Sequence, residues 1–257
     1  MLTFKGTTLF FIFVLIGMAI YGLIQDFPLP YFIIPITIYI SIVAYGSASI
    51  QSGFFMNVIS KGDASVPEIA ITFDDGPHPE TTPAILDILK QNKITATFFC
   101  IGERAAENPD LIRRIVDEGH ILGNHSHSHH VFFNLFSKKN MVRELRACNR
   151  TIEKMIGKRM LMFRPPYGVT NPSLAKAVEE VRITPIGWSL RSMDTVTKDP
   201  GKLVQKINSK LGPGDIILMH DTKKVTVEAL PEIINLVRQK ELTVKRIDDL
   251  LKIHEYA

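Results

Sequence analysis

Hydrophobic positions follow two different patterns along the 257-residue chain. Residues 9–24 form an uninterrupted apolar run, LFFIFVLIGMAIYGLI, and a second uncharged run extends over residues 31–50. With Thr7 and Thr8 the first run approaches the roughly 20 residues that a helix needs to cross a bilayer. A short polar stretch with two prolines separates the runs. The pattern predicts a membrane-anchoring segment over residues 1–60, formed by two transmembrane helices.

A cleaved secretory signal is the main alternative for this segment. Lys5 would supply its positive start, and Ser47-Ala48-Ser49 resembles a small-residue cleavage site. Both apolar runs, however, exceed the usual signal core of about 7–15 residues, which favours a retained hairpin. A pair of helices buried in a globular core is a third, weaker interpretation.

From residue 67 onward, short β-branched runs alternate with longer mixed runs, which predicts alternating strands and helices. Such repeated units form a parallel sheet with helices outside it, and their number suits a small or incomplete βα-barrel over residues 67–257. The expected strands are 68–73, 96–101, 120–123, 160–163, 183–188, 215–219 and 242–244. The expected helices are 82–91, 109–118, 138–156, 171–181, 201–211 and 227–239.

Charge separates the two parts of the chain. Residues 1–66 carry only Lys5, Asp26, Lys61 and Asp63, so the net charge of +4 resides in the rest. Charges of both signs are interspersed there, which excludes a nucleic-acid-binding patch. If both helices span the membrane, Lys5 and Lys61 lie on the same side of it as the domain. The positive-inside rule then favours a cytoplasmic domain. Because a single span would reverse this, the sequence predicts an integral membrane protein of undetermined orientation.

Polar clusters follow the ends of five expected strands. In a βα-barrel the carboxyl ends of the strands converge on one face, and that face carries the active site. We therefore expect these side chains to meet. The clusters are Asp74-Asp75, His125 to His130, Arg164, Arg191 with Asp194, and His220-Asp221.

Asp75, His125 and His129 offer one carboxylate and two imidazoles to a divalent metal. Three protein ligands leave a position open for water, as in hydrolytic zinc sites. If residues 125–129 take a helical turn, the rings of His125 and His129 point the same way. His127 would then be turned away. A surface histidine-rich tract is the alternative for this run.

The remaining charged groups suggest acid–base chemistry. Asp74 could take a proton from an attacking water while Asp75 holds the metal, although Asp-Asp-Gly-Pro also suits a simple turn. Arg164 is always charged and could pair with Asp74; a surface salt bridge is its alternative. His220 could protonate a leaving amine, or be a histidine satisfied at the rim of the core.

Four stretches in order resemble the polysaccharide deacetylase family, carbohydrate esterase family 4. They are Thr72-Phe73-Asp74-Asp75-Gly76-Pro77-His78, His125-Ser126-His127-Ser128-His129, Arg164-Pro165-Pro166-Tyr167-Gly168 and Leu218-Met219-His220. The resemblance covers nearly all of residues 67–257 and none of residues 1–60. It implies a distorted seven-stranded βα-barrel and metal-dependent hydrolysis of an N-acetyl group on a sugar.

The resemblance also implies roles for individual residues. It makes Asp74 the base, His220 the acid and Arg164 the group that orients Asp74. It assigns a divalent metal, usually zinc, to Asp75, His125 and His129. In the substrate pocket it gives the backbone N–H of Tyr167 to the oxyanion and Leu218 to the acetyl methyl group, with Pro166 and Ser126 in support.

A fourth family motif departs from its usual form. The family often reads Asp-x-x-Asp-Trp after a strand bearing tryptophan, whereas this chain has Arg191 and Thr195 in place of the first Asp and the Trp. Asp194 keeps the second acid and joins the expected substrate-binding residues. Because the first Asp usually tunes the arginine equivalent to Arg164, its loss affects Asp74 unless Asp194 takes over.

These features predict a membrane-anchored deacetylase. Its substrate would be an N-acetylated amino sugar in a polysaccharide, in peptidoglycan or in a lipid-linked glycan. One alternative is a catalytically silent carbohydrate-binding membrane protein, produced by the Arg191 and Thr195 changes. Another is an amidohydrolase acting on a non-sugar amide, since one fold serves several chemistries.

Overall fold

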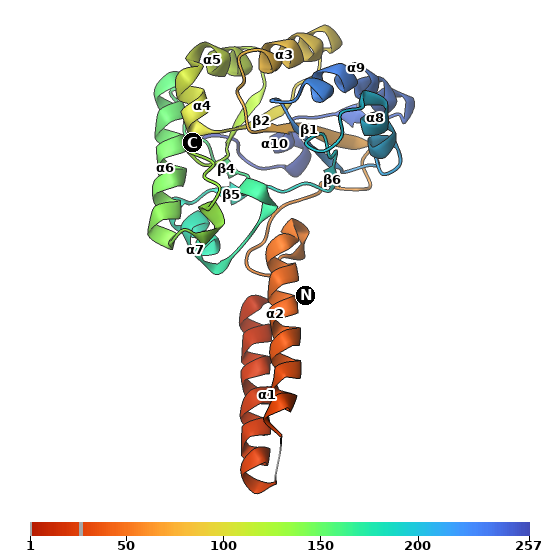
Figure 1. Ribbon diagram of the computed structural model, residues 1–257. Coiled ribbons are helices and arrows are strands. Elements are labelled where there is room, and N and C mark those ends of the chain that lie inside the picture. The colour runs from red at the N-terminus through yellow and green to blue at the C-terminus, as the bar shows by residue number, and fades with distance from the viewer. Residues whose placement is uncertain (1, 26–27) are drawn as a thin grey trace.

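A helical hairpin stands beneath an α/β domain in the computed structural model, which describes residues 2–25 and 28–257 (Figure 1). The chain enters α1 beside the domain, turns at the far end of the hairpin and returns through α2 to the domain. Asp26, the charge expected in the turn between the two spans, lies outside the described residues.

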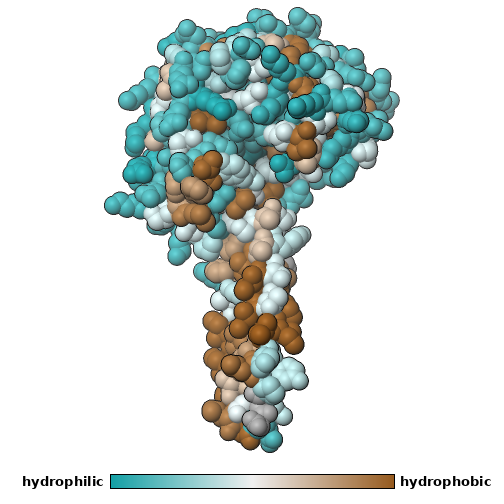
Figure 2. Space-filling view, viewed as in Figure 1, coloured by the Kyte–Doolittle hydropathy of each residue, from teal (hydrophilic) through white to brown (hydrophobic). Residues whose placement is uncertain are grey.

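The hairpin consists of α1 (Phe4–Ile24), a short 3-10 turn η1 (Leu29–Phe32) and α2 (Ile33–Ala48). Thr3 caps α1 by accepting a hydrogen bond from the Gly6 N–H. Both helices are long and apolar enough to cross a membrane, and only 6% and 11% of their most apolar windows are buried. Figure 2 shows hydrophobic residues along the length of the hairpin. The interpretation of a helix pair buried in a globular core is therefore wrong.

A curved parallel sheet forms the centre of the domain. Its strand order is β5-β4-β3-β2-β1-β7-β6, and β8 pairs with the start of β1. This arrangement confirms the distorted seven-stranded βα-barrel, with β5 and β6 as its edges. The strands are β1 (Glu68–Asp74), β2 (Thr97–Cys100), β3 (Ile121–Asn124), β4 (Met162–Phe163), β5 (Thr184–Pro185), β6 (Leu190–Arg191), β7 (Ile216–His220) and β8 (Thr243–Val244).

Helices cover the outside of the sheet (Figure 1). Their amphipathic faces bury apolar residues against it, as alternating strand and helix patterns require. Ser137 caps α6 by accepting a hydrogen bond from the Asn140 N–H, and Asn171 caps α7 through the Leu174 N–H. The helices are α3 (Thr81–Asn92), α4 (Gly102–Glu107), α5 (Pro109–Asp117), α6 (Lys138–Ile156), α7 (Pro172–Val181), α8 (Pro200–Asn208), α9 (Lys224–Gln239) and α10 (Ile247–Leu251).

The segment after the hairpin runs along the open side of the sheet. The Ile59 N–H donates to the Pro185 carbonyl at 3.1 Å, and the Gly187 N–H donates to the Ile59 carbonyl at 2.8 Å. The Gly62 N–H donates to the Gly214 carbonyl at 2.7 Å. Residues 59–62 thus fill space beside β5 and the start of β7, so the domain's contacts begin before residue 67.

The end of the hairpin is hydrogen-bonded to two loops of the domain. Ser47 donates its hydroxyl to the Thr170 carbonyl at 2.7 Å, and the Thr170 N–H donates to the Ser47 carbonyl at 3.0 Å. The Gln51 amide donates to the Trp188 carbonyl at 2.8 Å. Because these loops follow β4 and β5, the hairpin is attached at the carboxyl-end face of the sheet.

One aromatic ring fills the interior below that face. Phe99 on β2 lies directly across from Gly123 on β3 and is fully buried. The guanidinium carbon of Arg164 lies 4.1 Å from the centre of the Phe99 ring. A Cβ atom at Gly123 would overlap the Phe99 ring. Only a glycine therefore lets Phe99 occupy this place.

We expect Gly123→Ala to destabilise the protein by about 1–3 kcal/mol, because overpacking displaces Phe99 toward Arg164. Denaturant unfolding of the full chain in detergent measures this loss. Gly212→Ala is the matched control, since nothing lies within 4 Å of its added Cβ. Equal stability of the two variants would contradict this description of the interior.

Candidate active site

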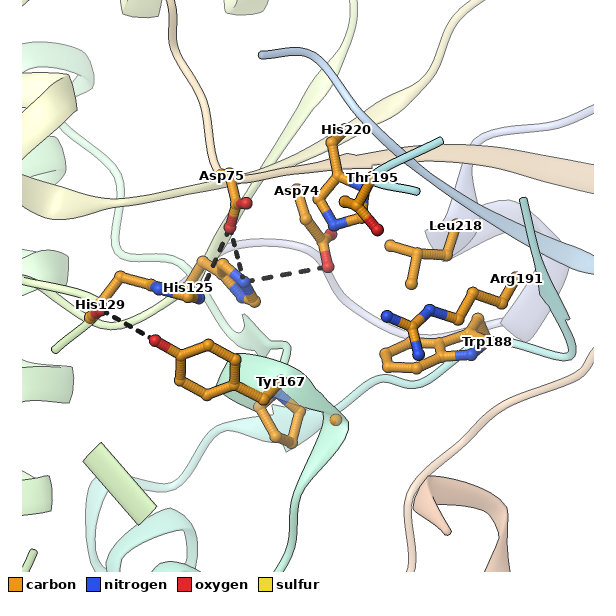
Figure 3. A pocket seen from close by; sticks show the side chains of 12 residues that line it. Asp74, Asp75, His125, His129, Tyr167, Trp188, Arg191, Thr195, Leu218 and His220 are labelled. Atoms are coloured by element: carbon orange, nitrogen blue, oxygen red, sulfur yellow. Dashed lines mark hydrogen bonds and ion pairs between the residues drawn. The ribbon is translucent and has the colours of Figure 1, made fainter. Parts of the chain in front are cut away.

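A pocket of about 250 Å³ opens at the carboxyl ends of β1, β3, β4 and β7 (Figure 3). This is the face on which the five polar clusters were expected to meet, and residues from four of them line it. The lining residues are Asp74, Asp75, His125, His129, Pro165, Tyr167, Gly168, Trp188, Arg191, Thr195, Leu218 and His220.

Asp75, His125 and His129 bring one ligand atom each to a single point of the pocket. The Nε2 atoms of His125 and His129 lie 3.4 Å and 3.5 Å from Oδ1 of Asp75, and the three donor atoms lie within 4.8 Å of one another. Two ligands of one tetrahedral zinc ion, each about 2.0–2.1 Å from it, are separated by roughly 3.3 Å. The donor set and its spacing therefore fit a divalent metal.

The protonation states of these groups suit metal binding. Burial, followed by the neighbouring His125, lowers the pKa of His129 to about 4, which leaves its ring neutral near pH 7. Burial would raise the pKa of Asp75, but hydrogen bonding and charge from His125 outweigh it and lower that pKa. A neutral imidazole and an ionised carboxylate are the forms that bind metals.

A hydrogen bond to the backbone of Arg164 orients the ring of His125. Its Nδ1 lies 2.8 Å from the Arg164 carbonyl. Because a carbonyl can only accept, Nδ1 carries a proton in either charge state of the ring. The neutral ring then presents the lone pair of Nε2 to the cluster, whereas the charged ring, with a second proton on Nε2, is the form that lowers the pKa of Asp75.

The loop after β3 is not the helical turn that the His125–His129 spacing suggested. Ser126 and His129 have φ values of 65° and 47°, in the left-handed region, and the segment between them is irregular. Asn124 accepts from the Ser126 N–H at 2.9 Å, and the Ser126 hydroxyl accepts from the His129 N–H at 3.1 Å. Local side-chain hydrogen bonds, not helical periodicity, bring the two rings together. The expectation that His127 points elsewhere holds, because its ring lies against Gly102.

Two charged residues that the sequence analysis did not identify stabilise the loops after β1 and β3. Glu144 on α6 accepts hydrogen bonds from the His127 and Ser128 N–H groups and the Ser128 hydroxyl, at 2.9–3.2 Å. Arg104 on α4 donates to the Asp75 carbonyl at 2.5 Å. Glu144 lies in the long amphipathic helix α6 and Arg104 in the six-residue α4, and nothing in the local sequence singles out either residue.

Asp74 is held by a fully buried arginine, Arg164. Arg164 is fully buried and donates from Nη1 to Oδ1 of Asp74 at 2.8 Å and to the Thr72 hydroxyl at 2.7 Å. Its other nitrogens reach the carbonyls of Gly187 and Ile186 at 2.8 Å and 3.4 Å. The second oxygen of Asp74 faces the pocket, 3.9 Å from Nε2 of His125. Asp74 therefore presents one free carboxylate oxygen beside the ligand cluster.

Asp194 contacts His220 and not Arg164. Its Oδ1 lies 2.8 Å from Nδ1 of His220, while its Oδ2 accepts from the His220 N–H at 2.6 Å and from the Thr226 hydroxyl at 2.7 Å. Burial would lower the pKa of His220, but the hydrogen bond and charge of Asp194 outweigh it and raise that pKa. Asp194 is 2% exposed and lies behind His220, outside the pocket lining. Asp194 therefore does not take over the contact with Arg164 that the missing first Asp would make.

The remaining residues expected at the substrate pocket differ in whether they line it or lie beneath it. Tyr167 has a φ of 63°, and its ring lies against that of His129 at an angle of 56°, with 4.7 Å between ring centres. Leu218 lines the pocket floor, whereas Pro166 is buried beneath the loop and its neighbour Pro165 reaches the pocket instead. Arg191 and Trp188 form the wall opposite the histidines (Figure 3).

Comparison with known proteins supports the family that the sequence motifs indicated. The sequence profile described as polysaccharide deacetylase matches residues 61–186. A peptidoglycan-N-acetylglucosamine deacetylase of Bacillus cereus is 34% identical over 189 residues, which are 72% of this chain and 88% of that protein. The peptidoglycan-N-acetylmuramic acid deacetylase PdaA of Bacillus subtilis is 34% identical over 194 residues, 74% of this chain and 73% of that protein.

Solved structures agree with the sequence relatives. The crystal structure of the Bc1960 peptidoglycan N-acetylglucosamine deacetylase superposes with a TM-score of 0.75 at 28% identity, covering 78% of this chain and 95% of that one. A CE4 family pseudoenzyme from Bacillus anthracis superposes with a TM-score of 0.70 at 30% identity, covering 75% and 68% of the two chains. The chain belongs to the polysaccharide deacetylase family, carbohydrate esterase family 4, a family of carbohydrate N-deacetylase hydrolases.

Proposed function

We propose that this protein is a membrane-anchored, metal-dependent hydrolase that removes the N-acetyl group from an amino sugar of peptidoglycan or a related glycan near the bilayer. One observation carries the proposal. The free oxygen of Asp74 lies beside the Asp75–His125–His129 cluster, and His220 with its buried carboxylate lies across the same pocket (Figure 3). A base and an acid thus face one point from two sides.

Each residue has a distinct task in amide hydrolysis. Asp74 takes a proton from the attacking water, whose oxygen bonds to the carbonyl carbon. His220 gives a proton to the amide nitrogen as the C–N bond breaks, which releases acetate and a free amine. A divalent metal held by Asp75, His125 and His129 would supply Lewis acidity, polarising the carbonyl and lowering the pKa of water at the site.

The remaining lining residues position the acyl group. Leu218 offers an apolar surface for the acetyl methyl group in the pocket that Trp188 also lines. The backbone N–H of Tyr167 would face the developing oxyanion, as the family resemblance implies. Its left-handed backbone turns this residue into the pocket.

Three features support a substrate close to a membrane. The two helices of the hairpin are apolar on all sides, which suits lipid better than water. The hairpin is hydrogen-bonded to loops that form the pocket rim, through Trp188 and Thr170. The loop after His129 exposes three large apolar residues, Val131, Phe132 and Leu135. Its Asn134 carbonyl accepts from Asn171, so this loop lies on the hairpin's side of the pocket.

Loss of activity is the main alternative, because one structural relative is a pseudoenzyme. In this chain, however, the base, the acid and all three expected metal ligands are present and mutually oriented. A binding protein would not need a buried carboxylate behind His220. Hydrolysis of a non-sugar amide is a second alternative, and assays on sugar and non-sugar amides distinguish it from the proposed function.

We expect Asp74→Asn to lower acetate release by about 10²–10⁴-fold, since an amide cannot accept the proton of the attacking water. The full chain in detergent is assayed with added zinc on an N-acetylglucosamine oligomer and on peptidoglycan. A chelator should abolish release and zinc should restore it. Asp117→Asn, an exposed carboxylate on α5, is the control. Unchanged release from Asp74→Asn would contradict the assignment.

We expect Asp194→Asn to move the alkaline limit of activity to lower pH, by about 1–3 pH units. His220 works in its protonated form, so activity falls as the pH rises through the pKa of His220. Because Asp194 raises this pKa, its neutral replacement lowers it. The pH dependence of kcat measures the effect. An unmoved alkaline limit would show that another group is the acid.

We expect tags placed before Met1 and after Ala257 to lie on the same side of the membrane, because two spans return the chain to its starting side. Protease protection of both tags in sealed vesicles measures this. Tags on opposite sides would indicate one span. Release of the first 48 residues from the mature protein would indicate a cleaved signal.

A further inference from the structure

Arg191 is a charged residue that the proposed reaction does not use. It lies on the edge strand β6, opposite Leu218 of β7, and it lines the active-site pocket. Figure 3 shows its guanidinium directed into the pocket alongside Trp188. Among the described residues it has neither an ion pair nor a hydrogen bond from its side chain.

The two arginines near the pocket therefore differ in how many hydrogen-bond donors they have free for a ligand. Arg164 is buried and uses its nitrogens on Asp74, Thr72 and two carbonyls. Arg191 is exposed, and all five of its N–H donors remain open to a ligand. A free guanidinium fork binds the planar pair of oxygens of a carboxylate or phosphate. Arg191 is thus placed to contact an anionic group of the substrate.

A second hollow of about 310 Å³ continues from the pocket at Thr195, which lines both. Three lysines line it: Lys198, Lys223 and Lys224. None of them forms an ion pair with a carboxylate in the part of the chain that the structure describes. Glu228 and Asp194 are the acids in the lining, and Asp194 is already bonded to His220 and Thr226.

The charges favour phosphate over a single carboxylate. Arg191 alone would suffice for one carboxylate, whereas the three lysines extend the positive surface beyond it. Inside the pocket, Arg164 compensates Asp74, and Asp75 faces the cluster that fits a divalent cation. Among the described residues that line the active-site pocket, no carboxylate is therefore left to repel a phosphate next to Arg191. Glu228 lines only the second hollow, where the three lysines outnumber it.

We propose that the substrate is an N-acetylated amino sugar joined to a phosphate or diphosphate, which Arg191 binds and which extends toward Lys198, Lys223 and Lys224. This inference rests on the proposed deacetylase function and specifies its substrate class. A glycosyl phosphate can come from a lipid carrier or from a soluble nucleotide sugar. The position of the pocket rim beside the hairpin makes the lipid-borne form the expected source.

The test compares substrates that differ in charge. The full chain in detergent micelles with zinc is given a neutral N-acetylglucosamine oligomer, N-acetylglucosamine 1-phosphate, UDP-N-acetylglucosamine, a lipid-linked N-acetylglucosaminyl diphosphate and an N-acetylmuramic acid oligomer. Acetate release gives kcat/KM for each. We expect the phosphate-bearing substrates to exceed the neutral oligomer by tenfold or more.

The variant Arg191→Gln connects the preference to its residue. We expect the ratio of kcat/KM for phosphate-bearing to neutral substrates to fall at least tenfold in Arg191→Gln, and less in Arg191→Lys, which keeps the charge but loses the fork. Arg150→Gln, an exposed arginine on α6, is the matched control, with the ratio unchanged. Equal thermal unfolding of the four proteins shows that each is folded.

The outcomes separate this inference from the function on which it rests. Release from the neutral oligomer with no phosphate preference, or a preference that Arg191→Gln keeps, overturns the inference and leaves the deacetylase in place. Preference for the muramic carboxylate without one for phosphate also overturns it. No metal-dependent release from any substrate overturns the deacetylase itself. Faster turnover of the lipid-linked diphosphate than of the soluble phosphates, both dependent on Arg191, supports the inference and identifies the lipid source.

Discussion

The ion pair between Arg164 and Asp74 is the constraint on which the active site depends. Both side chains are almost completely withdrawn from water, and a buried charge is tolerated only when it is paired and hydrogen-bonded. Arg164 meets this requirement with Asp74, Thr72 and two carbonyls, while Phe99 covers its face. The pairing occupies one oxygen of Asp74 and leaves the other facing the proposed metal ligands, 3.9 Å from Nε2 of His125. The same residue fixes His125 through its backbone carbonyl.

The three imidazoles of the site differ because different partners stand behind them. A carbonyl orients His125, burial and a neighbouring ring keep His129 neutral, and the Asp194 carboxylate favours the charged form of His220. One residue type can therefore serve both as the proposed metal ligands, His125 and His129, and as the proposed acid, His220, because the environment of each ring differs. Arg191 adds a cation to the pocket wall whose side chain has no ion pair or hydrogen bond with the described residues, and this is the basis for proposing that substrate charge binds there.

The sequence predicted the long elements and the residues at strand ends, because hydrophobic periodicity and motif order are local signals. It missed β6, α4 and α10, which are two to six residues long and have no measurable period. The histidine spacing suggested a helical turn, but the loop contains two left-handed residues, Ser126 and His129. Their N–H groups donate to the side chains of Asn124 and Ser126. The contacts of Glu144 and Asp194 join segments far apart in the chain, so no local pattern reveals them.

The free energy of unfolding of four proteins tests the central role of the Arg164–Asp74 pair most directly. They are the original chain, Arg164→Met, Asp74→Asn and the double variant. If the pair is the constraint, Arg164→Met alone should cost about 3–5 kcal/mol, because it leaves Asp74 charged and buried. Adding Asp74→Asn should then recover a large part of that loss. Losses that simply add in the double variant would contradict the account, since the two groups would then be independent.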